Sequence, residues 1–345
     1  MKKIEELLHV IEGHKVFIQT HNFPDPDAIG AAFGIQQLLE EYGVESQIVY
    51  KGTLDKLSVV RMLDFTGIKV HEISTVDHMT EEDYIILVDC QKNNKNVTDF
   101  IGDEVACIDH HPVFEECEYK YIDIKLVGSC SSVVAGYYFE AGKIPSIEVA
   151  TALIYGMKID TNDFSRGVTE FDVEMYFKLF KYADKTILQK LALNSICFED
   201  LRAHGAAIND ISLFDNIGFA VLPFDCPDGL IGVISDFILA LDVVDACVVY
   251  SIRSDGYKFS MRSEIDRVDA GKVLNSVLKG LNGNGGGHAF MAGGFLPNES
   301  VKTLGEEPRL SLEKLFVGAI YPGIDIGEDG FIRGNEGHCK WHHKD

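Results

Sequence analysis

The chain carries a short run that combines an imidazole with carboxylates, His21-Asn22-Phe23-Pro24-Asp25-Pro26-Asp27. An apolar, β-branched run at 15–20 precedes it, and a helical pattern over 27–42 follows. Pro24 and Pro26 hold the residues before them out of the helical conformation. One imidazole and two carboxylates on a rigid turn repel one another unless a cation neutralises them. A helix N-cap with two solvated neighbours explains the same residues, so this run alone leaves both interpretations open.

The same pattern, an apolar run that ends in an acidic residue or a histidine, occurs three more times. Asp89 follows the apolar run 84–88, and Asp109-His110-His111 follows the run 104–108. Asp160 ends the helical pattern at 147–159. In an open parallel α/β sheet, ligands bind beyond the carboxyl ends of the strands. The series therefore predicts one site at which several strand ends meet.

A two-metal centre is the chemistry that fits these residue types. Imidazole and carboxylate ligands without a thiolate favour Mn²⁺ or Mg²⁺, with Co²⁺ or Fe²⁺ as further options, over structural zinc. Six donor residues are too many for one ion with open positions but suit two ions about 3.5–4 Å apart. Such a pair activates water and clamps phosphoryl oxygens, and Asp89, on the middle strand, is the natural bridging ligand. The predicted metal ligands are His21, Asp25, Asp27, Asp89, His110 and Asp160.

The densest glycine stretch of the chain supplies a candidate for phosphate binding. Gly285-Gly286-Gly287-His288 follows a helical pattern, and backbone N–H groups in such a turn can form an anion-binding nest. Arg262, at the end of the preceding strand, could bind a phosphate in bidentate fashion. A flexible loop with an incidental histidine is the alternative.

The elements that must position these residues alternate between strands and helices, which predicts an α/β protein. We expect an N-terminal, doubly wound, mostly parallel sheet, followed by a smaller C-terminal α/β domain that closes over the active-site cleft. The predicted division is a catalytic domain at 1–200, a connector at 201–215, a substrate-binding domain at 216–326 and a polar tail at 327–345. Further strands are predicted at 46–50, 120–123, 218–223, 246–253 and 258–262, and helices at 1–12, 54–66, 128–141, 228–240 and 268–281.

Composition limits the classes of partner. The formal net charge of −23 disfavours a protein that grips long duplex nucleic acid through its phosphates. No apolar run is long enough to span a membrane, and the N-terminal residues lack the apolar core of a signal peptide. Cys90, Cys107, Cys130 and Cys247 lie in apolar contexts that predict buried free thiols in a reducing cytoplasm. The tail residues 337–343 contain His and Cys but match no zinc template, so we expect a frayed terminus.

In their order, the motifs resemble those of a known superfamily. His21-x-x-x-Asp25-x-Asp27-Ala28-Ile29-Gly30, Asp89, Asp109-His110-His111 and Asp160-Thr161 resemble the four motifs of the DHH phosphoesterase superfamily. Segments 260–263, 285–288 and 292–294 are similar to the DHHA1 domain that accompanies it. The compact layout is most similar to the nano-RNase/pAp-phosphatase branch.

The resemblance implies a role for each motif residue. One ion would be held by His21, Asp25 and Asp89, and the other by Asp27, Asp89, His110 and Asp160. Asp109 would orient a ligand, His111 would contact the substrate phosphate, and both belong to the catalytic set. Pro26 and Met291 stand where many relatives have a smaller residue.

The sequence therefore predicts a metal-dependent hydrolase of phosphoester bonds. The expected substrates are short oligoribonucleotides or a nucleoside bisphosphate such as pAp, with intermediates of cyclic dinucleotide breakdown as a variant. Hydrolysis of polyphosphate or another phosphoanhydride is the alternative reaction. A nucleotide-binding regulator without turnover and a structural metal protein are the alternatives from other classes. We expect no membrane partner, and the chain could form a homodimer.

Overall fold

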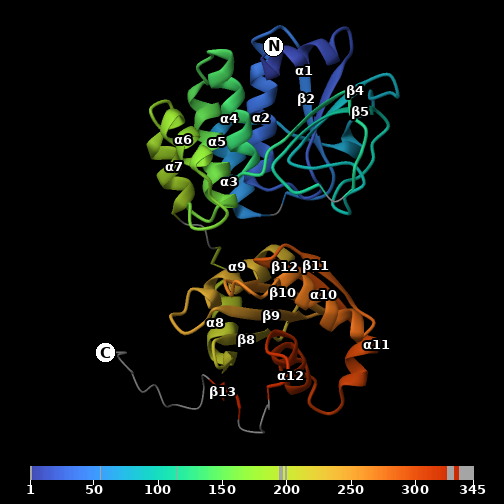
Figure 1. Cartoon of the computed structure of the whole chain (residues 1–345), viewed down its shortest axis with the longest axis vertical. Coiled ribbons are helices and arrows are strands. Elements are labelled where there is room, and N and C mark those ends of the chain that lie inside the picture. Colours follow the sequence, from blue (N-terminus) through green and yellow to red (C-terminus); the bar gives the residue numbers. More distant parts are fainter. Residues whose placement is uncertain are drawn as a thin grey trace. The chain divides into compact units, whose positions relative to one another are not determined.

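The computed structural model describes residues 2–54, 56–113, 115–193, 197–198, 200–324 and 330–333. The chain forms two compact units, Met1–Ser195 and Ile196–Asp345 (Figure 1). The division falls before the 201–215 segment that the sequence assigns to a connector. There Leu201–Asp210 forms helix α8, which packs against the sheet of the second unit, so it belongs to that unit.

The first unit is built on a six-stranded, wholly parallel sheet with the strand order β3-β2-β1-β4-β5-β6. The strand order changes direction between β1 and β4, which pair in register from Val16 opposite Tyr84. At such a switch point, the loops that follow neighbouring strands diverge and leave room for a ligand. The strands are β1 (Val16–Gln19), β2 (Ser46–Tyr50), β3 (His71–Glu72), β4 (Tyr84–Val88), β5 (Asp103–Asp109) and β6 (Tyr121–Ile124).

The helices of this unit share one hydrophobic core with one face of the sheet. They are α1 (Lys3–Ile11), α2 (Pro26–Glu40), α3 (Leu57–Thr66), α4 (Cys130–Ala141), α5 (Ile147–Asp160), α6 (Glu170–Phe180) and α7 (Lys185–Ala192). Loop residues such as Met79 and Phe100 cover the other face, where a doubly wound sheet would carry helices. The connections before and after β4 hold only one short 3₁₀ turn, η1 (Ile73–Thr75), among described residues.

Local sequence signals set where the helices around the site begin. Asp25 is the N-cap of α2 and accepts hydrogen bonds from the N–H groups of Asp27 and Ala28, at 3.0 and 3.1 Å. Pro26 occupies the first helical position, where no N–H is needed. Ser129 caps α4 in the same way through the N–H of Ser132. The predicted starts of these two helices are therefore confirmed.

Glycines allow α2, α4 and α5 to pack closely. A Cβ at Gly30 of α2 would lie 2.8 Å from the carbonyl oxygen of Ala152 of α5. A Cβ at Gly156 of α5 would lie 2.3 Å from Ser131 Oγ and 2.9 Å from Asp27 Oδ1. All three contacts are too short for a Cβ, so these glycines set the distance between the helices that carry Asp27 and Asp160.

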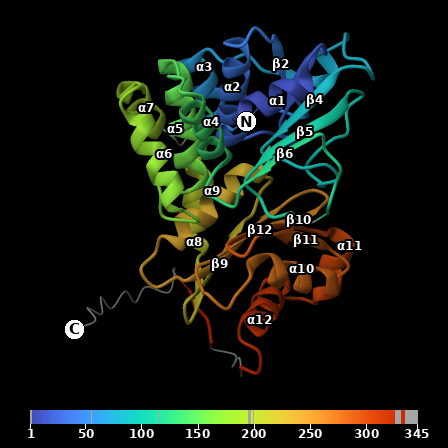
Figure 2. The ribbon, with the colours of Figure 1, turned by 45° about the horizontal axis from the view of Figure 1, so that its top comes forward.

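The second unit contains a seven-stranded sheet with the order β11-β12-β10-β9-β8-β7-β13, in which only β8 and β9 pair in parallel. Its strands are β7 (Ser212–Phe214), β8 (Ile217–Leu222), β9 (Ala246–Ile252), β10 (Gly256–Ser263), β11 (Asn284–Gly287), β12 (Met291–Pro297) and β13 (Ile332–Arg333). One face packs against α8 and α9 (Asp228–Leu239). The other packs against α10 (Ala270–Gly280) and α12 (Pro308–Ile320), and a short helix, α11 (Asn298–Val301), with a 3₁₀ turn, η2 (Lys302–Leu304), links β12 to α12 (Figure 2).

The glycine stretch forms the edge strand β11 rather than the predicted turn, because it pairs with β12 along its length. Its glycines serve two faces. Gly285 and, on β12, Gly294 face α10, where a Cβ would meet Leu274 or Leu278 at 3.2 and 2.3 Å. Gly286 points the other way, and no atom lies within 4 Å of the position that its Cβ would take. This strand therefore presents bare backbone on one face.

The structure also tests the expectations for the cysteines and for membrane-spanning helices. Cys90, Cys107, Cys130 and Cys247 are buried and free, as predicted. No helix of the described residues is long and apolar enough to cross a membrane. The His/Cys-containing tail at 337–343 lies outside the described residues. The cytoplasmic location and the homodimer stay predictions.

Candidate metal centre

The structure brings all six predicted metal ligands together at one end of the first sheet. His21 follows β1, and Asp89 follows β4 directly. His110 comes immediately after β5, and Asp160 is the last residue of α5. The two remaining carboxylates, Asp25 and Asp27, stand at the start of α2. The site thus lies at the carboxyl ends of β1, β4 and β5, on both sides of the switch point.

The donors form two groups on either side of Asp89. In the first, the ligand atoms of His21, Asp25 and Asp89 lie within 4.8 Å of one another, and His21 Nε2 is 3.8 Å from Asp25 Oδ2 and 3.7 Å from Asp89 Oδ2. The second group, Asp27, His110 and Asp160, is equally compact. Asp89 also reaches this group, because its Oδ1 is 3.3 Å from His110 Nε2. Asp89 therefore stands where a bridging ligand would.

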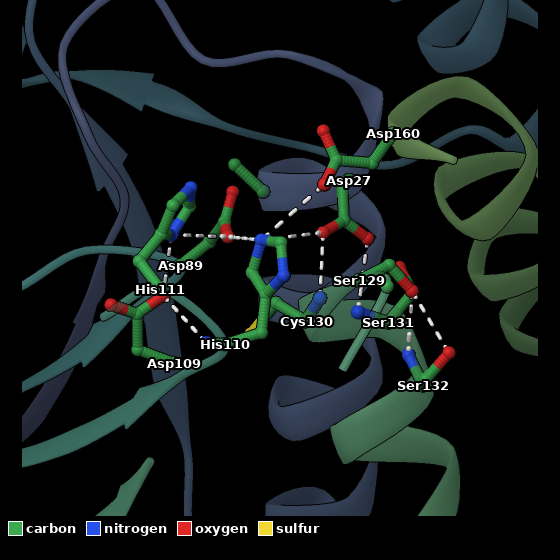
Figure 3. Close-up of polar contacts among 12 residues, drawn as sticks. Asp27, Asp89, Asp109, His110, His111, Ser129, Cys130, Ser131, Ser132 and Asp160 are labelled. Atoms are coloured by element: carbon green, nitrogen blue, oxygen red, sulfur yellow. Dashed lines mark hydrogen bonds and ion pairs between the residues drawn. The ribbon is translucent and has the colours of Figure 1, made fainter. Parts of the chain in front are cut away.

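The imidazole of His110 lies at the centre of the second group (Figure 3). Its Nε2 is 3.3 Å from Asp160 Oδ2 and 4.0 Å from Asp27 Oδ2, while its Nδ1 is 3.0 Å from the carbonyl oxygen of Val127. That carbonyl holds the ring with Nδ1 as the donor, which leaves Nε2 to face the carboxylates as a ligand atom.

Asp27 is fully buried, yet it is well supplied with hydrogen-bond donors. Its two carboxylate oxygens accept the N–H groups of Cys130 and Ser131, the first two residues of α4, at 2.7 and 2.9 Å. A helix N-terminus favours an anion, so α4 stabilises the ionised form. Burial and the nearby charges of Asp89 and Asp160 act in the opposite direction and raise the pKa of Asp27.

Asp109 and His111, the predicted catalytic pair, lie beside the metal ligands. Asp109 Oδ1 accepts from His111 Nδ1 at 2.9 Å and from the N–H of His110 at 2.7 Å. Its Oδ2 accepts from the amide of Gln91 at 2.6 Å, and Gln91 also donates to the His111 carbonyl oxygen at 3.2 Å. Gln91 is a supporting residue that the sequence analysis missed. Its one signal is its place two residues beyond Asp89, at the start of the polar segment 91–96.

Two atoms at the centre test whether a cation fits. Asp89 Oδ1 and His110 Nε2 are buried and lie 3.3 Å from each other, yet neither makes a well-formed hydrogen bond to any described residue. Buried polar atoms are otherwise almost always paired, so this pair of atoms requires a partner of another kind. Oxygen and imidazole donors on all sides suit Mn²⁺ or Mg²⁺. The residues present therefore fit divalent cations.

The titration behaviour of the centre points to the same conclusion. Burial lowers the pKa of His21, but the ion pair with Asp25 and the charge of Asp89 outweigh it and raise this pKa to about 9. The pKa of His110 is also raised, because Asp89, Asp27 and Asp160 outweigh the burial of its ring. Burial raises the pKa of Asp160 to about 6. Without metal, the raised pKa values of His21 and His110 favour protonated imidazoles that pair with the surrounding carboxylates.

Metal binding should therefore release protons. A ligand nitrogen must be deprotonated. The pKa of His21 is about 9 and that of His110 is raised well above its ordinary value, so at pH 7 we expect the two histidines to release about two protons per chain. Because the free site gains protons as the pH falls, the apparent affinity for Mn²⁺ should rise with pH until both histidines are neutral. Titration calorimetry with Mn²⁺ in buffers of different ionisation enthalpy measures this release. A binding heat that does not depend on the buffer would contradict it.

The predicted substrate-binding residues all lie in the second unit. Arg262 is held in place on β10, where its side chain is 11% exposed: Nε donates to Asp236 Oδ1 at 2.6 Å, and Nη1 donates to Ser260 Oγ at 3.0 Å. Ser260 lies opposite Gly293, and Gly293 lies opposite Gly286, so one face of the sheet carries the guanidinium and the bare backbone. His288 is exposed just beyond β11.

Two models of known protein families match the chain. The model of the DHH family, N-terminal domain, matches residues 15–157, and that of the DHHA1 domain matches residues 215–307. Each match falls within one of the two units. All the predicted metal ligands except Asp160, together with Asp109 and His111, lie inside the first match.

The chain is similar to several curated proteins. It is 29% identical over 297 residues to an uncharacterised protein of Methanocaldococcus jannaschii, covering 86% of this chain and 60% of that protein. It is 25% identical over 331 residues to the cyclic-di-AMP phosphodiesterase GdpP of Geobacillus thermodenitrificans, covering 90% and 49%. A probable manganese-dependent inorganic pyrophosphatase of Streptococcus mutans is 24% identical over 310 residues, covering 81% and 94%. The chain thus spans between about half and 60% of the length of the first two.

A solved structure shares the whole fold. The crystal structure of an exopolyphosphatase-related protein from Bacteroides fragilis has a TM-score of 0.75 to this chain and is 19% identical, covering 92% of this chain and 97% of that one. With the two domain models matched in order along a single chain, and the fold of both units in agreement, this protein belongs to the DHH/DHHA1 phosphoesterase family.

Proposed function

We propose that the chain is a metal-dependent phosphoesterase that hydrolyses short oligoribonucleotides or nucleoside bisphosphates such as pAp. One observation carries the proposal: two groups of imidazole and carboxylate donors meet at Asp89, at the switch point of a parallel sheet. His21, Asp25 and Asp89 would hold one divalent ion, and Asp27, Asp89, His110 and Asp160 the other. When bound, two such ions, with Mn²⁺ the first choice, polarise phosphoryl oxygens and lower the pKa of a water.

The chain's own residues position the substrate around this centre. Asp109, fixed by Gln91, holds His111 through Nδ1, so that its imidazole is oriented to contact a substrate phosphate. The N-terminus of α4 holds the Asp27 carboxylate through two N–H groups and favours its ionised, metal-binding form.

The second unit supplies the proposed grip on the substrate. Gly286 and Gly293 expose backbone on the same face of the sheet as Ser260 and Arg262. A phosphate or ribose can approach such a bare strand closely, and the guanidinium lies beside it. His288 would add a further contact. Among the described residues, we find no long basic track with interleaved aromatic rings, which is why short substrates are preferred.

Two further reactions are favoured by specific relatives. The similarity to GdpP favours cyclic dinucleotides or their linear products, and the similarity to the pyrophosphatase favours a phosphoanhydride. All of these substrates offer the same phosphate to the metal centre, so the metal ligands do not distinguish them. Recognition of the group attached to the phosphate must therefore distinguish these substrates.

A parallel assay tests the proposal. We expect the Mn²⁺-loaded protein to convert a dinucleotide to mononucleotides, and pAp to AMP and phosphate. Chromatography of the reaction mixture identifies these products. Cyclic-di-AMP, pyrophosphate and polyphosphate are assayed beside them. Rapid hydrolysis of polyphosphate without turnover of any nucleotide would reject the proposal in favour of a phosphoanhydride hydrolase. Binding of the nucleotides without any turnover would identify a regulator instead.

A further inference from the structure

An exposed aromatic side chain stands inside the metal-binding turn. Phe23, between the proposed ligands His21 and Asp25, exposes 54% of its surface. Its backbone has a φ of 55°, in the left-handed region that side-chain-bearing residues rarely adopt. An aromatic ring held outward by an unfavourable backbone at a reaction site calls for a functional explanation.

The chain fixes this ring on both sides of the turn. The N–H of Phe23 donates to the carbonyl oxygen of Lys51 at 2.8 Å, and the N–H of Asn22 donates to that of Asn96 at 2.6 Å. The ring itself rests on Gly52: a Cβ there would lie 2.6 Å from both Cδ1 and Cε1 of the ring. Gly52 has a φ of 107°, a conformation suited to glycine. One face of the ring is therefore seated on backbone.

The segment that carries this seat is also held firmly. Glu72, on β3 beside the end of β2, accepts from Lys51 Nζ at 3.2 Å and from the N–H of Ser74 at 2.7 Å. Its Oε1 lies 3.5 Å from the N–H of Gly52. The ring and its support thus form one rigid surface.

This surface adjoins the metal centre. One residue separates Phe23 from each of His21 and Asp25, so its Cα lies within about 7 Å of theirs. The turn and Gly52 follow β1 and β2, which are neighbours in the sheet. A ligand whose phosphate lies at the ends of β1, β4 and β5 can therefore extend over the ends of β1 and β2.

We infer that Phe23, seated on Gly52, is the stacking platform for a nucleobase of the substrate. The inference rests on the proposed function and deepens it, because it names the base-bearing substrates as the preferred class. Every nucleobase has a π-face, and a rigid aromatic ring binds it without hydrogen bonds to its edges. The site would therefore favour nucleotides over polyphosphate and would tolerate different bases.

Replacement of the ring separates base recognition from phosphate chemistry. We expect Phe23→Leu to raise KM for a dinucleotide about 10-fold, the effect of losing one stacked base. For the same dinucleotide with an abasic ribose in place of the stacked nucleoside, KM should change less than about twofold. Phe23→Tyr, which keeps the ring, is the matched control and should retain the wild-type KM for both. Equal effects on both substrates would show that the ring supports the turn or a protein contact, and would overturn the inference.

A second measurement does not depend on turnover. Trp341 is the only tryptophan of the chain, so Phe23→Trp in a Trp341→Phe background reports on this position alone. AMP should quench the fluorescence of this variant, and ribose 5-phosphate, which lacks the base, should not. Equal responses to the two ligands would overturn the inference.

The two proposals fail in different ways. Absence of nucleotide hydrolysis by the wild-type protein, with turnover of polyphosphate, rejects the proposed function. Nucleotide hydrolysis by the wild type, with an unchanged KM in Phe23→Leu, rejects only the platform. Nucleotide quenching without hydrolysis supports the platform in a protein that binds nucleotides but does not cleave them.

Discussion

Asp89→Asn is expected to abolish phosphoester hydrolysis while leaving the fold intact. Asp89 lies within reach of both donor groups, at 3.7 Å from His21 Nε2 and 3.3 Å from His110 Nε2. Loss of a residue that merely supports a metal ligand lowers metal affinity or activity about 10- to 100-fold. Loss of a shared ligand should therefore lower kcat at least about 100-fold. The backbone tolerates the change, because asparagine adopts the left-handed conformation of Asp89, φ 61°, as readily as aspartate.

The opposite end of the same strand supplies a matched control. Asp83, the residue before β4, is also buried, and its carboxylate accepts the N–H of Thr80 at 2.8 Å. Asp83→Asn removes a buried charge from the same unit without touching the centre, so it should keep wild-type kcat. Circular dichroism checks the fold of both variants, and the Mn²⁺-dependent assay compares their rates. Wild-type rates in Asp89→Asn would refute the two-group arrangement.

Asp27→Asn is expected to lose activity and, in contrast to Asp89→Asn, to loosen the start of α4. Both oxygens of Asp27 accept backbone N–H groups, from Cys130 and Ser131. The amide of asparagine offers one acceptor and turns an N–H₂ group towards the other donor, which leaves that donor unsatisfied at a cost of about 1–3 kcal/mol.

Hydrogen–deuterium exchange of the metal-free protein measures this effect directly. Amide exchange in the first turn of α4 should be about 5- to 150-fold faster in Asp27→Asn, the equivalent of the same free-energy cost. Asp89→Asn should leave this exchange unchanged, because among the described residues the first N–H groups of α4 donate to Asp27 and not to Asp89. Unchanged exchange in both variants would mean that α4 does not depend on the Asp27 carboxylate.

The parts of the molecule that follow from nearby residues could be predicted from the sequence. Asp25 caps a helix that begins at Pro26, and the apolar runs before Asp89 and Asp109 are strands, because capping and strand formation depend on neighbouring residues. Since parallel strands end at one edge, their terminal residues had to meet there. The model of the DHH family, N-terminal domain, covers these residues in its match to 15–157.

The parts that depend on distant residues could not be predicted. Glycine has no strand preference, so β11 exists only because β12 pairs with it and α10 packs on Gly285 and Gly294. The contact between Gln91 and Asp109 depends on how the loop after β4 folds over β5. The loops that cover the second face of the first sheet, with Met79 and Phe100, carry no helical period to identify their role.

The close packing of α2, α4 and α5 has a consequence for the order of folding. The contact between Asp27 and Cys130 joins residues 103 positions apart, and Gly156 must dock against both helices before the donors face one another. Such non-local contacts form late, after the entropy of closing long loops has been overcome. Divalent ions therefore find their complete ligand set only on the native side of the folding barrier. When bound, they would slow the unfolding of the native protein and would not speed its folding.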